Sequence, residues 1–255
     1  MTLLVGMYYD NKKGALIASD SRCLSGYDLN SPLQKIFQIQ GVTFAFTGTV
    51  HMRDELLIEL TQKMIDKTSQ TEIHKAVQEA YNLRRTWYLG GENPLLNKEK
   101  KFSCSGLFGF YSDEPKLFTV DDRGMIQSSN LVQSDGQKPE YALELLKSLY
   151  WNNISKEQAI NSVVHVINEV SKRNSGVDNQ VQIATIEKEG SQILNYNNGD
   201  LDFGKFFPII EELESAHTAE SQRLALHILL NGQSKYRSRL ENLLSRFKED
   251  GKNPF

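Results

Sequence analysis

The opening stretch of the sequence, residues 2–20, reads TLLVGMYYDNKKGALIASD, and it sets the expected architecture. Aliphatic and aromatic residues fill positions 2–9, and a second apolar run, ALIAS, occupies positions 15–19. The segment between them, DNKKG at 10–14, is polar and ends in glycine. Two apolar runs joined by such a turn predict a β-hairpin. We therefore expect an antiparallel sheet whose first strand begins at the second residue of the chain.

Further along the chain, strand and helix patterns alternate in blocks. Near Gly48 the strands give way to apolar residues spaced three or four positions apart, as on one face of a helix. Ile154 and Ser155, followed by Gln158, predict a hydrophobic staple and a capping box at the start of a later helix. The expected strands cover 2–9, 15–19, 33–39, 42–47, 101–111, 116–120, 125–132, 181–186 and 191–196, and the expected helices cover 50–65, 70–88, 138–150 and 155–173.

This order of elements predicts an α+β fold with four layers. Blocks of strands are separated by pairs of helices, so two antiparallel sheets packed face to face, each covered by a helix pair, would bury every apolar face. Residues 1–200 would form this αββα sandwich as one domain. Residues 201–255 contain no strand pattern but have helical periodicity, so we expect them to form a helical C-terminal extension.

The composition argues against several classes of function. The 255 residues carry a formal net charge of −3, which provides no basic field for nucleic acid or for an anionic membrane surface. No apolar stretch approaches the roughly 20 residues that a membrane-spanning helix needs. The first residues lack the basic segment and the cleavage site of a signal peptide. We therefore expect a cytoplasmic protein without nucleic-acid or membrane partners.

Neither a metal nor a cofactor is expected. Cys23 and Cys104 are far apart, the five histidines are scattered, and no set of these residues has metal-ligand spacing. Two reduced thiols in a cytoplasmic protein are the plain interpretation of the cysteines. The sequence contains neither a P-loop nor a GxGxxG motif, so nothing in it indicates nucleotide binding.

Four motifs, taken in order, resemble a known family. They are the opening TLLVG, the strand end ASDSR with the QKIF that follows it, the segment FAFTGTV, and the stretch GLFGFY…PKLFTVDDRG. Together they resemble the proteasome β-type subunits, which are N-terminal nucleophile hydrolases. The order of elements over residues 2–196 is also similar, and the rest of the chain lies outside the resemblance.

The resemblance implies a catalytic group at the start of the chain. Thr2 would be the nucleophile, with Asp20 and Lys35 as its electrostatic partners. Gly48 would donate a backbone N–H to the oxyanion, and Arg22 matches a family position beside the site. Taken singly, each of these residues has an ordinary explanation as a strand, turn or surface residue. Only their combination in the family pattern indicates a site.

The chemistry of these residue types supports the assignment. A threonine hydroxyl is a weak nucleophile unless a base lies next to it. Once Met1 is removed, the α-amine of Thr2, with an ordinary pKa of about 7.7–8.0, supplies a base within the same residue. An ammonium group on Lys35 would favour the neutral amine and the developing alkoxide. Asp20 would keep that ammonium group charged and oriented.

The sequence departs from the family at supporting positions. By alignment through SDGQ, the family's serine falls on Asp135, with Ser134 beside it. The family's aspartate falls on Asn174, and a later serine falls on Val177. An asparagine can form hydrogen bonds but carries no charge. We expect Ser134, Asp135 and Asn174 to support the threonine amine, with Asp135 supplying the missing negative charge.

The resemblance also implies a first specificity pocket, lined by Cys23, Leu33, Phe46 and Val50. The phenylalanine would narrow this pocket and favour a small or apolar side chain of the substrate. The same four residues would serve equally well as plain core. Because the family encloses its sites inside rings, the resemblance implies a peptide or protein substrate and self-association into rings or an open oligomer.

Three functions remain open at this point. The first is a threonine peptidase, in which water releases the acyl group from Thr2. The second is a peptide ligase or transpeptidase, in which an amine instead of water intercepts the same acyl-enzyme. The third is a non-catalytic structural subunit of a proteasome-like assembly. Asn174 and Val177 favour the third, whereas the presence of Thr2, Asp20 and Lys35 opposes it, because a scaffold does not need them.

Overall fold

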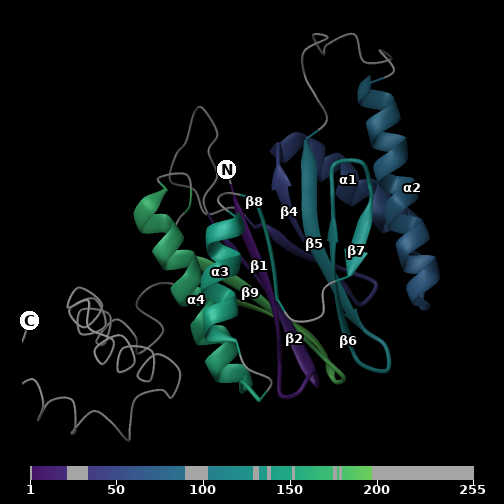
Figure 1. Cartoon of the computed structure of the whole chain (residues 1–255). Coiled ribbons are helices and arrows are strands. Elements are labelled where there is room, and N and C mark those ends of the chain that lie inside the picture. Colours follow the sequence, from purple (N-terminus) through teal and green to yellow (C-terminus); the bar gives the residue numbers. More distant parts are fainter. Residues whose placement is uncertain are drawn as a thin grey trace, which may run out of the picture. The chain divides into compact units, whose positions relative to one another are not determined.

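The computed structural model describes residues 2–21, 34–89, 103–128, 132–136, 139–150, 153–174, 177 and 180–196, and Figure 1 shows their arrangement. These residues form strands, a helix pair, strands, a second helix pair and strands, in the order that the sequence predicts. The expected helical extension at 201–255 lies outside the described residues. It therefore stays a prediction, and so does the division into two domains.

The first sheet contains five strands in the order β10-β9-β2-β1-β8. The predicted opening hairpin is confirmed, because Tyr9 pairs with Gly14 and Leu4 pairs with Ser19. Every residue of its two strands is buried, since another layer covers each face of this sheet. The strands are β1 (Leu3–Tyr9), β2 (Gly14–Asp20), β8 (Val132–Gly136), β9 (Val181–Glu187) and β10 (Gly190–Tyr196).

The second sheet has the strand order β3-β4-β5-β6-β7. Its strands are β3 (Ile36–Ile39), β4 (Val42–Gly48), β5 (Cys104–Tyr111), β6 (Pro115–Val120) and β7 (Ile126–Ser128). The expectation of one strand over 125–132 was wrong, because β7 ends in this sheet and β8 begins in the other. An extended pattern indicates strand backbone but does not say which sheet the strand joins. The change of sheet places β8 next to β1.

Within the described residues, four helices accompany the sheets: α1 (Val50–Lys63), α2 (Gln70–Leu89), α3 (Pro139–Leu149) and α4 (Lys156–Arg173). The predicted capping box of α4 is confirmed, since Ser155 and Gln158 each accept the other's backbone N–H through a side-chain oxygen. Ser69 and Glu72 make an equivalent pair of bonds at the start of α2. Helix bounds therefore follow local signals closely.

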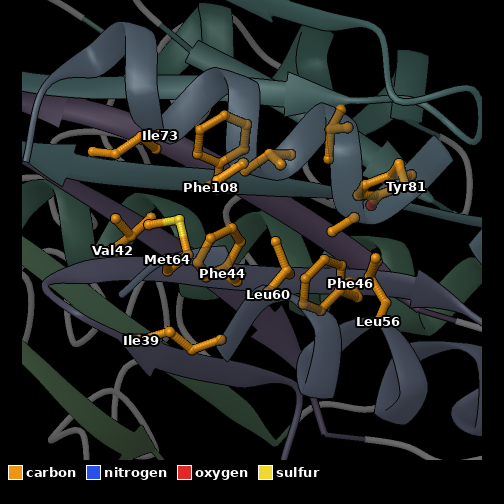
Figure 2. Packing of buried hydrophobic residues seen from close by; sticks show 14 of the residues in the cluster. Ile39, Val42, Phe44, Phe46, Leu56, Leu60, Met64, Ile73, Tyr81 and Phe108 are labelled. Carbon is orange, nitrogen blue, oxygen red and sulfur yellow. The ribbon is translucent and has the colours of Figure 1, made fainter. Parts of the chain in front are cut away.

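The predicted four-layer αββα sandwich is confirmed. One apolar cluster fills the space between the second sheet and the α1/α2 pair, and Figure 2 shows Phe44 and Phe108 at its centre, with ring centroids 5.7 Å apart. A second cluster joins the two sheets, with Leu4 and Ile17 from one and Leu107 from the other. On the opposite side, α4 packs on β1 and β2, and α3 packs on β8. The start of β1 therefore lies in the interior of the sandwich.

Candidate active site

A buried ion pair lies at the end of the opening hairpin. Asp20 is the last residue of β2, and Lys35 directly precedes β3. The Lys35 Nζ atom lies 2.9 Å from Asp20 Oδ2, and the two side chains are 3% and 0% exposed. A charge buried without a partner would cost several kcal/mol, so neither group is stable here without the other. The pair also ties the first sheet to the strand that opens the second.

The same carboxylate holds the start of β1. The backbone N–H of Leu3 donates to Asp20 Oδ1 over 2.8 Å, so the two carboxylate oxygens have different partners. Leu3 follows Thr2 directly, and Thr2 is itself 8% exposed. The structure thus brings the predicted nucleophile and the carboxylate–ammonium pair to one end of the hairpin, connected through a single backbone amide.

Two glutamines, Gln182 of β9 and Gln180 directly before this strand, hold the arrangement in place. The backbone N–H of Lys35 donates to Gln182 Oε1 of β9 over 2.8 Å. The backbone N–H of Ser21 donates to the carbonyl oxygen of Gln180 over 2.9 Å, and the Ser21 hydroxyl pairs with the Gln180 side chain over 3.2 Å. The sequence analysis did not single out either glutamine. The VQIAT segment predicts a strand, but only the strand order shows that this strand borders β2.

Two glycines in close backbone contacts lie at the same end of the sandwich. Gly48 and Gly136 have φ angles of +112° and +95°, a conformation that favours glycine. A β-carbon added to Gly48 would lie 2.1 Å from the carbonyl oxygen of Ser103, and one added to Gly136 would lie 2.1 Å from the carbonyl oxygen of Thr2. No side chain fits at either position without moving backbone. Gly48 is exposed and lies two residues before α1, whose amide-rich N-terminus suits a developing negative charge.

Asp135 lies next to this site, but its partners are hydroxyl and amide groups. Its Oδ2 atom accepts a hydrogen bond from the Ser105 hydroxyl over 2.7 Å, and its Oδ1 atom accepts one from the backbone N–H of Gly136 over 2.8 Å. The Ser105 hydroxyl in turn lies 3.0 Å from the Thr47 hydroxyl. Ser105, Thr47 and Gly136 are therefore neighbours of the site that the sequence analysis missed. The hydrogen bond from Ser105 to Asp135 joins strands of different sheets, which local spacing does not reveal.

The other predicted residues divide into three groups. Arg22, Cys23 and Leu33 lie outside the described residues, and so does the side chain of Ser134. Phe46 is buried in the cluster under α1, stacked on Phe44, and Val50 is the half-buried first residue of α1. Asn174 is the C-cap of α4. Its backbone N–H donates to the carbonyl oxygen of Ser171, and its carbonyl oxygen accepts from the backbone N–H of Val177.

The described part of the chain contains neither a cluster of potential metal ligands nor a candidate membrane-spanning helix. No group of three or more histidine, cysteine or acidic side chains is placed to hold a metal ion there. Within the same ranges, no helix is long and apolar enough to cross a membrane. Cys104 is a free thiol, and burial raises its pKa to about 12, so it is a poor nucleophile at neutral pH.

The chain is similar in sequence to proteasome subunits. A family model described as "Proteasome subunit" matches residues 4–186. The proteasome subunit beta 2 of Pyrococcus furiosus is 32% identical over 110 residues, which cover 42% of this chain and 52%, about half, of that subunit. The proteasome subunit beta 1 of Thermococcus sibiricus is 24% identical over 187 residues, which cover 72% of this chain and 86% of that subunit.

A solved structure supports the fold independently. The Anbu (Gly-1) mutant from Hyphomicrobium sp. strain MC1 superposes with a TM-score of 0.69 and 14% sequence identity. The match covers 85% of this chain and 96% of that chain. At this level of identity the likeness concerns the arrangement of the four layers and not the chemistry of the site.

Proposed function

Because the chain belongs to the proteasome subunit family, we propose that it is an N-terminal-threonine hydrolase in which Thr2 attacks a peptide bond after removal of Met1. The family supports a peptidase of the N-terminal nucleophile class or a proteasome-like subunit. Self-assembly into rings is the family's mode of association. The identity of the nucleophile, a peptide or protein as substrate, a homo-oligomeric assembly and a cytoplasmic location are our proposals.

One observation carries the proposal most strongly. Asp20 bridges the ammonium group of Lys35, over 2.9 Å, and the backbone N–H of the residue that follows Thr2, over 2.8 Å. A buried ion pair is an expensive way to stabilise a protein, because apolar residues of similar size stabilise a core equally well or better. A fixed positive charge beside a threonine favours the unprotonated amine and the alkoxide that the reaction requires.

The proposed reaction proceeds in two balanced steps. The α-amine of Thr2 takes the proton from its own hydroxyl, and Oγ attacks the carbonyl carbon of the peptide bond. The resulting oxyanion accepts the N–H of Gly48, and the tetrahedral intermediate collapses when the protonated amine gives its proton to the leaving nitrogen. An ester on Thr2 remains. Water then attacks the ester, with the amine again as proton acceptor, and releases the acid and the free threonine.

Intact-mass spectrometry with a β-lactone tests this proposal. Attack by Thr2 on the lactone carbonyl breaks the ring C–O bond and retains every atom of the probe in the ester. We expect the untreated protein to lack the mass of Met1 and the treated protein to gain the full mass of the probe. Thr2→Ala should gain none, whereas the matched variant Thr2→Ser, which keeps the hydroxyl, should still react.

Two further outcomes separate the alternatives. Equal labelling of wild type and Thr2→Ala would contradict the proposal. Retention of Met1 without any labelling would also contradict it and would favour the structural subunit. If labelling occurs at Thr2, a peptide substrate incubated with a competing amine distinguishes hydrolysis from transpeptidation. A hydrolase yields the free acid, and a ligase yields the new amide.

A further inference from the structure

We propose that Asp135, Ser105 and Thr47 form a hydrogen-bond relay that positions the Gly48 turn relative to Thr2. The inference rests on the proposed function, because it assigns these three side chains to the same reaction. They come from three strands: Thr47 from β4, Ser105 from β5 and Asp135 from β8. The first two strands belong to one sheet and the third belongs to the other, so the relay crosses between the sheets.

The direction of hydrogen-bond donation along the relay follows from the number of hydrogens that each side chain can donate. An ionised aspartate only accepts hydrogen bonds, so the single hydroxyl hydrogen of Ser105 must point to Asp135 Oδ2, 2.7 Å away. Ser105 then has no hydrogen left for Thr47, and the 3.0 Å contact between the two hydroxyls must be donated by Thr47. The hydrogens therefore run one way, from Thr47 to Ser105 to Asp135.

Each end of the relay reaches a backbone segment of the site. At one end, the N–H of Gly136 donates to Asp135 Oδ1 over 2.8 Å, and Gly136 pairs with Leu3 and crowds the carbonyl of Thr2. At the other end, Thr47 immediately precedes Gly48, the proposed oxyanion donor. The relay thus connects the strand that borders the nucleophile with the turn that would bind the oxyanion.

A carboxylate at this position has a physical consequence that a hydroxyl would lack. A chain of three hydroxyls can run in either direction and so has two competing arrangements of hydrogens. With Asp135 at one end only a single arrangement is available, and hydrogen bonds to an ionised acceptor are shorter and stronger than neutral ones. In this proposal Asp135 acts on the site by positioning its neighbours, and the charge-supplying role expected from the sequence stays a prediction.

Ser105 and Asp135 are only half-buried and border a cavity of about 440 Å³ that Asp121 and Gln127 also line. Water in this cavity could satisfy both side chains if the relay were absent. Their hydrogen bonds are consequently not forced by burial, and loss of the relay is expected to alter local geometry more than overall stability.

The test compares Thr47→Val with Thr47→Ser under two electrophiles. Valine keeps the shape of threonine without the hydroxyl, whereas serine keeps the hydroxyl without the methyl group. A β-lactone acylates through a tetrahedral oxyanion. A peptide vinyl sulfone alkylates by addition to its double bond, and the transient negative charge lies beside the sulfonyl group and not on a carbonyl oxygen. Only the first probe requires the Gly48 turn.

We expect Thr47→Val to slow acylation by the β-lactone on the order of tenfold at saturating probe, the loss expected for one hydrogen bond. Its half-saturating concentration and its rate with the vinyl sulfone should change less than about twofold. Thr47→Ser should restore most of the acylation rate. Ser105→Ala should resemble Thr47→Val, and the double variant should be no slower than either single variant, because all interrupt one relay.

Equal slowing with both probes, or a Thr47→Ser variant as slow as Thr47→Val, would overturn the relay as a device that positions the oxyanion donor. An unchanged rate in Thr47→Val and Ser105→Ala, both folded by thermal melting, would overturn it as well. Failure of the proposed function is distinguishable, because wild type and Thr2→Ala would then react alike with both probes, and the relay would fall with it.

Discussion

The aromatic cluster under α1 and α2 and the ionic group at the start of β1 are both buried. The first consists of apolar side chains, whereas the second contains two charged ones. In the first, Phe44, Phe108 and Tyr81 lie fully buried among apolar side chains (Figure 2). In the second, the carboxylate of Asp20 and the ammonium of Lys35 are buried to the same degree.

The two regions differ in what they contribute. Each large apolar side chain stabilises the fold by about 1.5–3 kcal/mol when it leaves water. A buried ion pair contributes little net stability or even costs some, because desolvation offsets the attraction of the charges. The aromatic layer therefore stabilises the fold, whereas under the proposed function the charged group serves the reaction of Thr2. Variants in each region can test whether stability and reactivity depend on different residues.

The largest effect is expected at the ion pair. Lys35→Met should lower the rate of acylation about 10²–10⁴-fold, because the charge that favours the free amine and the alkoxide is lost. It should also destabilise the fold by about 3–5 kcal/mol, since Asp20 then stays buried without a partner. Urea denaturation and labelling by the β-lactone measure the two effects separately.

The double variant Asp20→Asn/Lys35→Met is the control for this prediction. With both charges removed, stability should return to within about 1 kcal/mol of wild type, while the activity stays lost. A double variant that regains activity together with stability would show that the pair serves the fold and not the chemistry.

The opposite result is expected for the aromatic cluster. Phe44→Ala should destabilise the protein by about 3–5 kcal/mol, because it deletes a fully buried ring and leaves a cavity. The fraction that remains folded should react with the β-lactone at the wild-type rate. A fall in that rate per folded molecule would mean that the two regions are coupled.

Gly136 separates the effect of geometry from that of charge, because it lies at the candidate site and has no charged side chain. Gly136→Ala should lower acylation on the order of 10²-fold, because the added β-carbon meets the Thr2 carbonyl and displaces the nucleophile. Gly41→Ala is the matched control: Gly41 also has a positive φ, +78°, but nothing lies within 4 Å of its added β-carbon. Its backbone strain should cost about 1–2 kcal/mol of stability and leave the reaction unchanged. Equal rates in the two variants would remove Gly136 from the site.

The smallest effect concerns His165, a titratable group that is buried on α4. Burial lowers the pKa of His165 to about 4, against an opposing effect of Glu169. The unfolded chain, with an ordinary histidine pKa near 6.5, therefore takes up a proton before the folded one does. The neutral, buried His165 therefore contributes its full share to the free energy of unfolding above pH 6.5. This free energy should fall by about 2 kcal/mol as the pH drops to 5. Urea midpoints at pH 7.5 and 5 measure this, and His165→Gln should flatten the difference. An unchanged pH dependence in that variant would contradict the assignment.

Much of this structure follows from local patterns in the sequence. The opening hairpin, the helix pairs and the Ser155 capping box were predictable because period, turn chemistry and caps act within a few residues. The positions of Asp20 and Lys35 next to the start of β1 followed from the family pattern and from the hairpin that returns β2 to the beginning of β1.

The remaining features depend on contacts between sheets, which no local pattern encodes. The stretch 125–132 looked like one strand, but β7 (Ile126–Ser128) belongs to one sheet and β8, which begins at Val132, belongs to the other. That change of sheet brings Asp135 to Ser105 and Gly136 to Thr2. Each of these residues has an ordinary local explanation, as a turn or a strand residue, so only the packed structure shows how they meet.

The proposed nucleophile is Thr2, the residue that removal of Met1 leaves at the amino terminus. The most direct measurement is peptide mapping by mass spectrometry of the full chain after reaction with the β-lactone. We predict that the probe is found on the peptide that begins with Thr2, with Met1 absent. A probe attached to any other residue, or an unreacted N-terminal peptide that still begins with Met1, would contradict it.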